Sequence, residues 1–332
     1  MRIVVAGLLV VMSAAPLAAQ TITAEQIADG LGLSAGDKKK LAAGEIVTTE
    51  VEGSNDKELA VGLALVVPAG LDQIAASVTK GTTLDANSAI LAHGEIDPAQ
   101  VDAAAFAGVT LPDSEVAELL AAEPGSEFNL STDEFAVFEE LGKQYKAGDA
   151  GAADAVNAAY RQMLAGRMQA YLASGLDGVA PYDRDGETSS AADDLKAGLE
   201  AAKLVQQFTP ELYQAFLAYP DQAVADVQQQ FLWSQQDADG RPVTILTHRT
   251  LQQRPDALVL LSRDFYVGHS FNASQAVAGA LPVDGGTAIF YGNRTSTDQV
   301  AGFGGALKRK IGGGMMRDSL IDTLKEVRAA WQ

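Results

Sequence analysis

Large and small apolar residues alternate along residues 58–67, which is the pattern of a strand that is covered on both faces. One parity carries only large side chains, namely Leu59, Val61, Leu63, Leu65 and Val67. The other parity is mostly small and consists of Ala60, Gly62, Ala64 and Val66. We therefore expect the first face to pack against a core, and the second to leave room for a helix or a cavity.

The last third of the chain predicts several strands followed by one long helix. Strand-like runs occupy residues 228–236, 242–252, 257–271, 275–281 and 287–295. The turn Asp237-Ala238-Asp239-Gly240 separates the first two runs. Residues 300–331 predict a helix, whose apolar stripe is Met316, Leu320, Leu324, Val327 and Trp331. Because such a helix can close over a sheet and enclose a cavity, the pattern favours a binding fold.

Helices dominate the middle of the chain. Apolar residues at helical spacing predict helices at 113–122, 131–146, 152–173, 190–208 and 210–219. Ser131 and Glu134 form a capping-box pattern at the start of the second of these helices. Two earlier strands are expected at 45–51 and 88–96. The pattern as a whole predicts an α+β fold with a helical insert at about 113–220.

The first twenty residues have the layout of a cleaved export signal. Arg2 precedes the apolar run 3–12, which is far shorter than the roughly 20 residues that a membrane-spanning helix needs. Small residues follow, up to a cut near Ala19. We therefore expect a signal peptide at 1–19, a single domain at 20–332, and a periplasmic location in a bacterium. The chain contains no cysteine, which excludes disulfides and thiolate zinc sites.

Charge narrows the range of partners. The formal net charge is −19, and so acidic a surface repels phosphate backbones, which argues against nucleic-acid binding. A basic cluster in the predicted terminal helix departs from this pattern and consists of Lys308, Arg309, Lys310 and Arg317. This cluster can make a transient contact with anionic lipid head groups, or it can be an ordinary solvated helix face.

The order of these elements resembles the START/Bet v 1-like superfamily, whose members are also called SRPBCC or helix-grip domains. The resemblance covers residues 46–331 and is supported by four local segments: 231–233, 247–249, 265–271 and 291–294. It implies a curved antiparallel sheet that is closed by the long C-terminal helix around an apolar tunnel. Many members carry sterols, phospholipids or other hydrophobic ligands, and a minority are cyclases or hydrolases. The superfamily shares no catalytic signature, so the resemblance assigns no catalytic residue.

Two histidines of the predicted strands are the candidates for chemistry. His248 or His269 can serve as a general base near Tyr266, and the pair can bind a metal together with a carboxylate such as Asp264. However, no metal-binding spacing such as HExxH is present, and strand histidines more often hydrogen-bond a neighbouring carbonyl or hydroxyl. We therefore expect no metal and no cofactor.

The adjacent pair His269-Ser270 suggests a base and a nucleophile. We expect the two side chains not to pair, because neighbouring residues of a strand point to opposite faces. Gly268-His269-Ser270 also lacks the GxSxG turn of serine hydrolases.

Arg294 lies in a polar stretch between the last strand and the terminal helix. It can face the anionic head of a ligand, or it can bridge to Asp298, and the second arrangement is the commoner one. Aromatic residues of the strands and the stripe of the last helix would wall the cavity. The expected ligand-binding residues are His248, Tyr266, His269, Arg294, Trp233, Phe265, Tyr291, Met316 and Leu320.

The sequence thus predicts a periplasmic binding or carrier protein for a hydrophobic small molecule or lipid. A hydrolase-like or cyclase-like enzyme on the same scaffold, with a strand histidine as general base, is the alternative. A third possibility is a structural domain whose core is filled.

Overall fold

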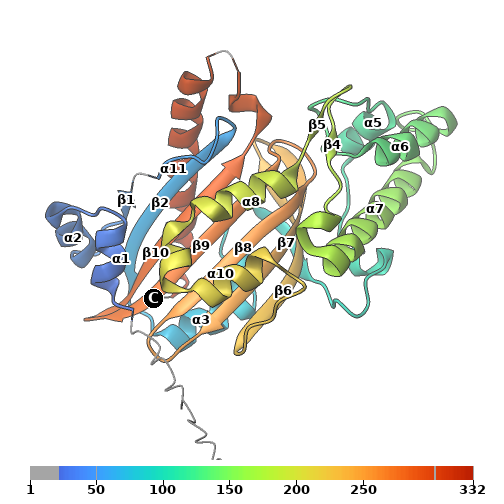
Figure 1. Ribbon diagram of the computed structural model, residues 1–332. Helices are drawn as coiled ribbons and strands as arrows, with labels where there is room; N and C mark the ends of the chain where they lie inside the picture. Colours follow the sequence, from blue (N-terminus) through green and yellow to red (C-terminus); the bar gives the residue numbers. More distant parts are fainter. Residues whose placement is uncertain (1–21, 50, 303, 332) are drawn as a thin grey trace, which may run out of the picture.

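An eight-stranded antiparallel sheet forms the centre of the computed structural model, which describes residues 22–49, 51–302 and 304–331 (Figure 1). The order of its strands is β1-β2-β10-β9-β8-β7-β6-β3. These strands are β1 (Val47–Thr49), β2 (Glu58–Val67), β3 (Ile90–Glu95), β6 (Val227–Ala238), β7 (Arg241–Gln253), β8 (Leu258–Val267), β9 (Ala273–Val283) and β10 (Gly286–Ser296). A separate two-stranded ladder pairs β4 (Tyr182–Asp183) with β5 (Thr188–Ser189).

Helices cover both faces of the sheet and extend beyond one of its edges (Figure 1). The α-helices are α1 (Ala24–Gly30), α2 (Ala35–Ala42), α3 (Leu71–Thr79), α4 (Thr82–Asp85), α5 (Asp113–Leu120), α6 (Thr132–Gln144), α7 (Ala152–Ser174), α8 (Ala191–Ala201), α9 (Lys203–Phe208), α10 (Pro210–Leu217) and α11 (Gly305–Ala329). Short 3₁₀ turns lie at Ala103–Phe106, Gly175–Gly178 and Asp298–Val300.

The two faces of the sheet carry different cores. One face bears Leu65, Leu258 and Ile289, and it is covered by α3 and by Val327 and Trp331 at the end of the chain. We call it the α11 face. The opposite face, which we call the α8 face, is covered by α1 and α2 beside β2 and β10, and by α8, α9 and α10 beside β8. Figure 1 shows α8 and α10 in front of the sheet.

Local sequence signals explain most of these elements. Asp239 and Gly240 both take positive φ in the two-residue loop between β6 and β7, as a type I′ hairpin requires. Ser131 accepts a hydrogen bond from the backbone of Glu134 and completes the predicted capping box of α6. The helix predicted at 190–208 is interrupted at Ala202, which separates α8 from α9.

The N-terminal region is more helical than the sequence analysis predicted. Residues 24–30 and 35–42 form α1 and α2, and each helix begins with a complete capping box at Thr23 and Ser34, respectively. The two helices pack beside β2 and β10, where Ala28 and Leu41 are buried.

The structure confirms the α+β class, the antiparallel sheet and the C-terminal helix. Among the described strands, β1 and β3 form two unpaired edges, so the sheet is open and not a closed barrel. Helices α5 to α10 occupy most of residues 113–217, between β3 and β6. The expected signal peptide at 1–19 lies outside the described residues. No helix within the described part of the chain is long and apolar enough to cross a membrane.

Burial on the α11 face predicts the result of truncating a core leucine. Leu65 has no exposed surface, whereas Leu91 on the edge strand β3 is 56% exposed. We expect Leu65→Ala to lower the free energy of unfolding by about 2–5 kcal/mol, because it removes buried methyl groups and leaves a cavity. Leu91→Ala should change it by no more than about 0.5 kcal/mol. Urea unfolding that shows similar losses for both variants would contradict this assignment of the core.

Candidate functional site

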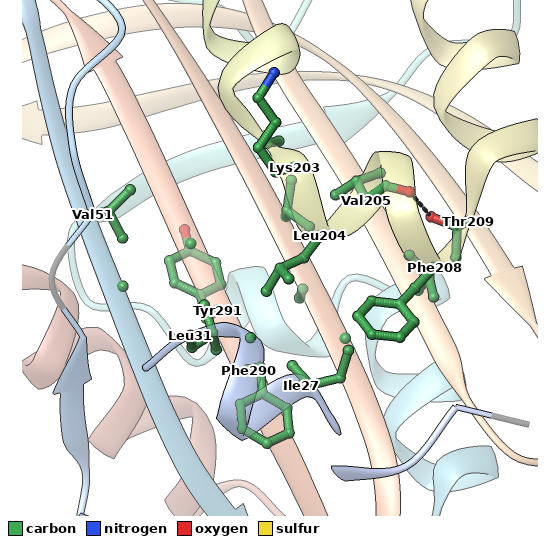
Figure 2. A pocket seen from close by; sticks show the side chains of 18 of the residues that line it. Ile27, Leu31, Val51, Lys203, Leu204, Val205, Phe208, Thr209, Phe290 and Tyr291 are labelled. Carbon is green, nitrogen blue, oxygen red and sulfur yellow. Dashed lines mark hydrogen bonds between the residues drawn. The ribbon is translucent and has the colours of Figure 1, made fainter. Parts of the chain in front are cut away.

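An apolar pocket with a volume of about 570 Å³ opens on the α8 face of the sheet. Strands β2, β8, β9 and β10 form its floor, and α1, α9 and residues 51–53 form its walls. Figure 2 shows Ile27, Leu204, Phe208 and Phe290 around the space. The volume lies within the range of roughly 300–1,000 Å³ that is usual for small-molecule sites. Because most of its lining residues are apolar, the pocket suits a hydrophobic ligand.

Two glycines keep the floor of the pocket free of side chains. Gly279 of β9 pairs with Phe290 of β10, and Gly292 lies two residues further along β10 on the same face. A Cβ atom at Gly292 would meet no atom within 4 Å, and one at Gly279 would only touch Leu281 Cδ1 at 4.0 Å. The space above both glycines is therefore open.

A third glycine lets the N-terminal chain pass close to the sheet. A Cβ atom at Gly62 would lie 1.9 Å from Thr49 Oγ1 and 2.9 Å from Val51 Cγ2. Gly62 therefore allows β1 and the following residues to form one wall of the pocket. The sequence predicted that this small-residue face of 58–67 would leave room, and the structure confirms it.

Helices α1 and α9 meet across the pocket. A Cβ atom at Gly30 would lie 2.7 Å from Leu204 Cδ2, so the glycine permits this close approach. The hydroxyl of Thr209 donates a hydrogen bond to the carbonyl of Val205 at 3.0 Å and holds the end of α9 (Figure 2). This wall was not predicted from the sequence, because α1 was not.

The polar end of the pocket contains Arg294. Its Nη1 atom lies 2.6 Å from Glu58 Oε2 and donates to the carbonyl of Glu52 at 3.0 Å. The bridge to Asp298 that the sequence suggested does not form, since Asp298 pairs with Lys57 and Arg184 instead. Arg294 does line the pocket, but the carboxylate of Glu58 balances its charge.

Gln275 and Arg263 continue the row that begins at Arg294. Arg294 is the cross-strand partner of Gln275 on β9, and Gln275 is the partner of Arg263 on β8. All three residues therefore lie on the α8 face. Gln275 lines the pocket and is buried, yet its amide nitrogen and oxygen have no partner among the described residues. Arg263 Nη2 donates to the carbonyl of Phe216, whereas its Nε and Nη1 have no such partner. Neither residue was predicted from the sequence as a binding residue.

His248 is the next residue of this row, on β7, and it is fully buried outside the pocket. The hydroxyl of Tyr171 lies 2.6 Å from its Nδ1, and Gln229 Oε1 lies 2.9 Å from its Nε2. Burial, and secondarily the charge of Arg263, lower the pKa of His248 well below its usual value. The neutral ring is therefore held on both sides as a part of the core.

His269 and Ser270 do form a hydrogen bond, contrary to the expectation from the sequence. Strand β8 ends at Val267, and Ser270 takes φ = 73° in the bend that follows. The alternation of a strand therefore does not apply here. Ser270 Oγ lies 2.6 Å from His269 Nδ1, while His269 Nε2 lies 3.0 Å from the carbonyl oxygen of Pro242. Neither residue lines the apolar pocket.

The structure divides the remaining expected ligand-binding residues between three places. Trp233, Phe265 and Tyr266 are buried in the core that α5 to α7 share with the sheet. Tyr291 borders the pocket, although strand alternation directs its side chain towards the α11 face.

Met316 and Leu320 are half-buried on α11. No described residue of α11 lines this pocket. It is therefore not the cavity beneath the last helix that the resemblance implies.

The described residues contain no group of three or more Asp, Glu or His side chains that could hold a metal ion. Comparisons with protein-family models, with curated proteins and with solved structures find no match to this chain. The geometry of the pocket is therefore the main basis for a functional proposal.

The carboxyl group of Asp264 gives the protein a testable pH dependence. It is half-buried and accepts a hydrogen bond from Thr247 Oγ1 at 2.7 Å. Burial raises its pKa to about 6, although the hydrogen bond from Thr247 and the charge of Arg249 oppose this shift. The folded protein thus binds the proton more tightly than the unfolded chain, and ionised Asp264 destabilises the fold.

We expect Asp264→Asn to stabilise the protein at high pH and not at low pH. The destabilisation by Asp264 is absent below about pH 4, grows between about pH 4 and pH 6, and is complete above that range. Asp264→Asn should therefore raise the free energy of unfolding by about 1–2 kcal/mol at about pH 8, and change it little at about pH 4. Urea titrations at both pH values measure this, and an equal effect at both would rule out a raised pKa.

Proposed function

We propose that this protein binds a hydrophobic small molecule or lipid in the apolar pocket of the α8 face. The observation that carries the proposal is the open floor at Gly279 and Gly292, which lies beneath apolar walls from α1 and α9. A filled structural core would place side chains in this space. The roughly 570 Å³ pocket and its few polar groups match the general character of ligand sites.

Membership of the START/Bet v 1-like superfamily remains a proposal. The antiparallel sheet and the long C-terminal helix support it. The position of the pocket on the face opposite α11 is a departure from the helix-grip pattern. A periplasmic location likewise rests on the signal-like residues 1–19. Taken together, these proposals describe the protein as an exported carrier for an apolar ligand.

An enzyme is the second candidate, and one observation favours it. The hydrogen bond between Ser270 Oγ and His269 Nδ1 couples a hydroxyl to a histidine whose pKa is lowered, first by burial and then by the charge of Arg241. The φ of 73° at Ser270 is also a conformation that is found at functional sites more often than elsewhere. Because this pair does not line the apolar pocket, we rank the enzyme below the carrier.

A side chain placed on the floor of the pocket should abolish binding. In Gly292→Leu the new side chain occupies the open space, and the backbone at this position does not need a positive φ. We expect the variant to fold and to lose at least roughly tenfold in affinity for dodecanol, measured by displacement of a fluorescent apolar probe.

Gly166→Leu is the matched control, because Gly166 is exposed on α7 and a Cβ atom there also meets no neighbour. This variant should bind dodecanol as the wild type does. If Gly292→Leu retains wild-type affinity, or if the wild-type protein binds no apolar probe, the proposed function is wrong.

A further inference from the structure

Two neighbouring residues at the polar end of the pocket have unpartnered polar atoms: Gln275 lines the pocket, and Arg263 lies behind it. Arg263 Nε and Nη1, together with Gln275 Nε2 and Oε1, have no partner among the described residues. Arg263 and Gln275 are only 0% and 4% exposed, respectively. Buried polar groups are nearly always hydrogen-bonded, and a buried charge without a partner is costly. Arg263 stacks on the Phe216 ring, with its Cζ atom 3.7 Å from the ring centroid, and it lies outside the pocket. The amide of Gln275 therefore indicates a bound polar group that the chain itself does not supply.

Charge decides what kind of group this is. Glu58 balances Arg294, but no carboxylate of the described residues lies within 4 Å of Arg263. The row Arg294–Gln275–Arg263 therefore carries one unbalanced positive charge. The Gln275 amide offers a donor to the pocket, and the positive potential of Arg263 behind it favours an acceptor with negative charge. A cationic head group would be repelled by Arg263.

We propose that the pocket binds an amphiphile whose polar end is a carboxylate. Its apolar part lies over Gly279 and Gly292, and its carboxylate accepts a hydrogen bond from Gln275. Arg263 is not a lining residue, so it acts from behind Gln275 as the cross-strand neighbour that supplies positive potential. This inference rests on the proposed function and adds the class of ligand to it.

Three ligands with the same alkyl chain test the proposal: dodecanoate, dodecanol and dodecyltrimethylammonium. The wild-type protein should bind dodecanoate roughly tenfold more tightly than dodecanol, because a hydrogen bond to a charged group is worth more than one to a neutral group. Dodecyltrimethylammonium should bind most weakly. Gln275→Met keeps the length of the side chain but removes the donor, so it should reduce the preference for dodecanoate while retaining the binding of dodecanol.

The outcomes separate this inference from the proposed function. If none of the three ligands binds, the proposed function fails. If all three bind with equal affinity, the pocket is a binding site and the carboxylate inference fails. An undiminished preference for dodecanoate in Gln275→Met would also overturn the role of Gln275. Circular dichroism of the variant shows whether it is folded.

A second inference rests on a different observation, an exposed apolar stripe on the first half of α11. Leu307, Ile311 and Met315 are 64%, 56% and 62% exposed, and their spacing of four residues places them on one side of the helix. The other large apolar side chains with this degree of exposure among the described residues are Leu91 and Val137, on other elements. Three such residues in one row form a surface that a partner can cover.

Basic residues surround this stripe. Residues 305–317 contain four Lys or Arg residues and no Asp or Glu, in a chain whose net charge is −19. At about 100° per residue, Lys308 lies on one side of the stripe and Lys310 on the other. Both lysines are exposed, and no carboxylate of the described residues lies within 4 Å of either. An apolar stripe between cations is the pattern of a helix that lies on an anionic membrane surface.

We infer that residues 305–317 of α11 bind the surface of an anionic lipid bilayer. Leu307, Ile311 and Met315 enter the interface between head groups and acyl chains, while Lys308 and Lys310 contact lipid phosphates. The acidic remainder of the protein stays in water. The contact is peripheral and needs no membrane-spanning segment.

Flotation with vesicles tests this inference on the full-length protein. Vesicles that contain phosphatidylglycerol should bind the wild type, and vesicles of phosphatidylcholine alone should bind it much more weakly. The double variant Lys308→Glu/Lys310→Glu should bind at least roughly twentyfold more weakly, because each lysine contributes about fivefold near an anionic surface. Ile311→Ser should also weaken binding.

The matched control changes the net charge equally at another site. Lys39 and Lys40 are exposed on α2, and Lys39→Glu/Lys40→Glu should bind vesicles nearly as well as the wild type. Equal losses in the two double variants would show that net charge alone governs binding. That result, or equal binding to both kinds of vesicle, would overturn the assignment of α11.

Discussion

The structure depends on the unequal volume of side chains on the two faces of β2 and of the middle of β10. The α11 face is filled by residues such as Leu65 and Ile289, whereas the α8 face has glycine at positions 279 and 292. A leucine at either glycine would gain roughly 1.5–3 kcal/mol if it were fully buried. Glycine also lowers the stability of a strand interior. The α8 face therefore lacks the stabilisation that larger buried side chains would give, and the open space of the pocket results from their absence.

Local chemistry made much of the fold predictable. The period of two in 58–67 and the hairpin at Asp239-Gly240 depend on neighbouring residues only, and the same holds for the cap at Ser131. The end of β8 was harder to predict, because Ser270 adopts positive φ without glycine or asparagine to indicate it. That single bend allows the hydrogen bond to His269 which strand alternation had excluded.

The site itself could be predicted only in part. The small-residue face of β2 indicated open space, but alternation does not reveal which helix covers which face. The cavity was therefore predicted beneath the last helix. The caps of α1 at Thr23 and of α2 at Ser34 were readable, whereas the approach of Gly30 to Leu204 is a tertiary contact. Gln275 becomes a binding candidate only through its register with Arg263, which depends on how β8 and β9 pair.

The positions of the two proposed surfaces constrain how they can work together. The pocket lies on the α8 face and α11 lies on the other, so the sheet separates the ligand from any bilayer that α11 contacts. A lipid cannot pass directly from that bilayer into the pocket, because the packed layer around Leu65 and Ile289 lies between them. The helix would then hold the protein at a membrane, while the ligand reaches the pocket on the α8 face from the aqueous phase. This geometry favours a ligand with appreciable solubility as a monomer, which a carboxylate confers on an alkyl chain more readily than a neutral head group does.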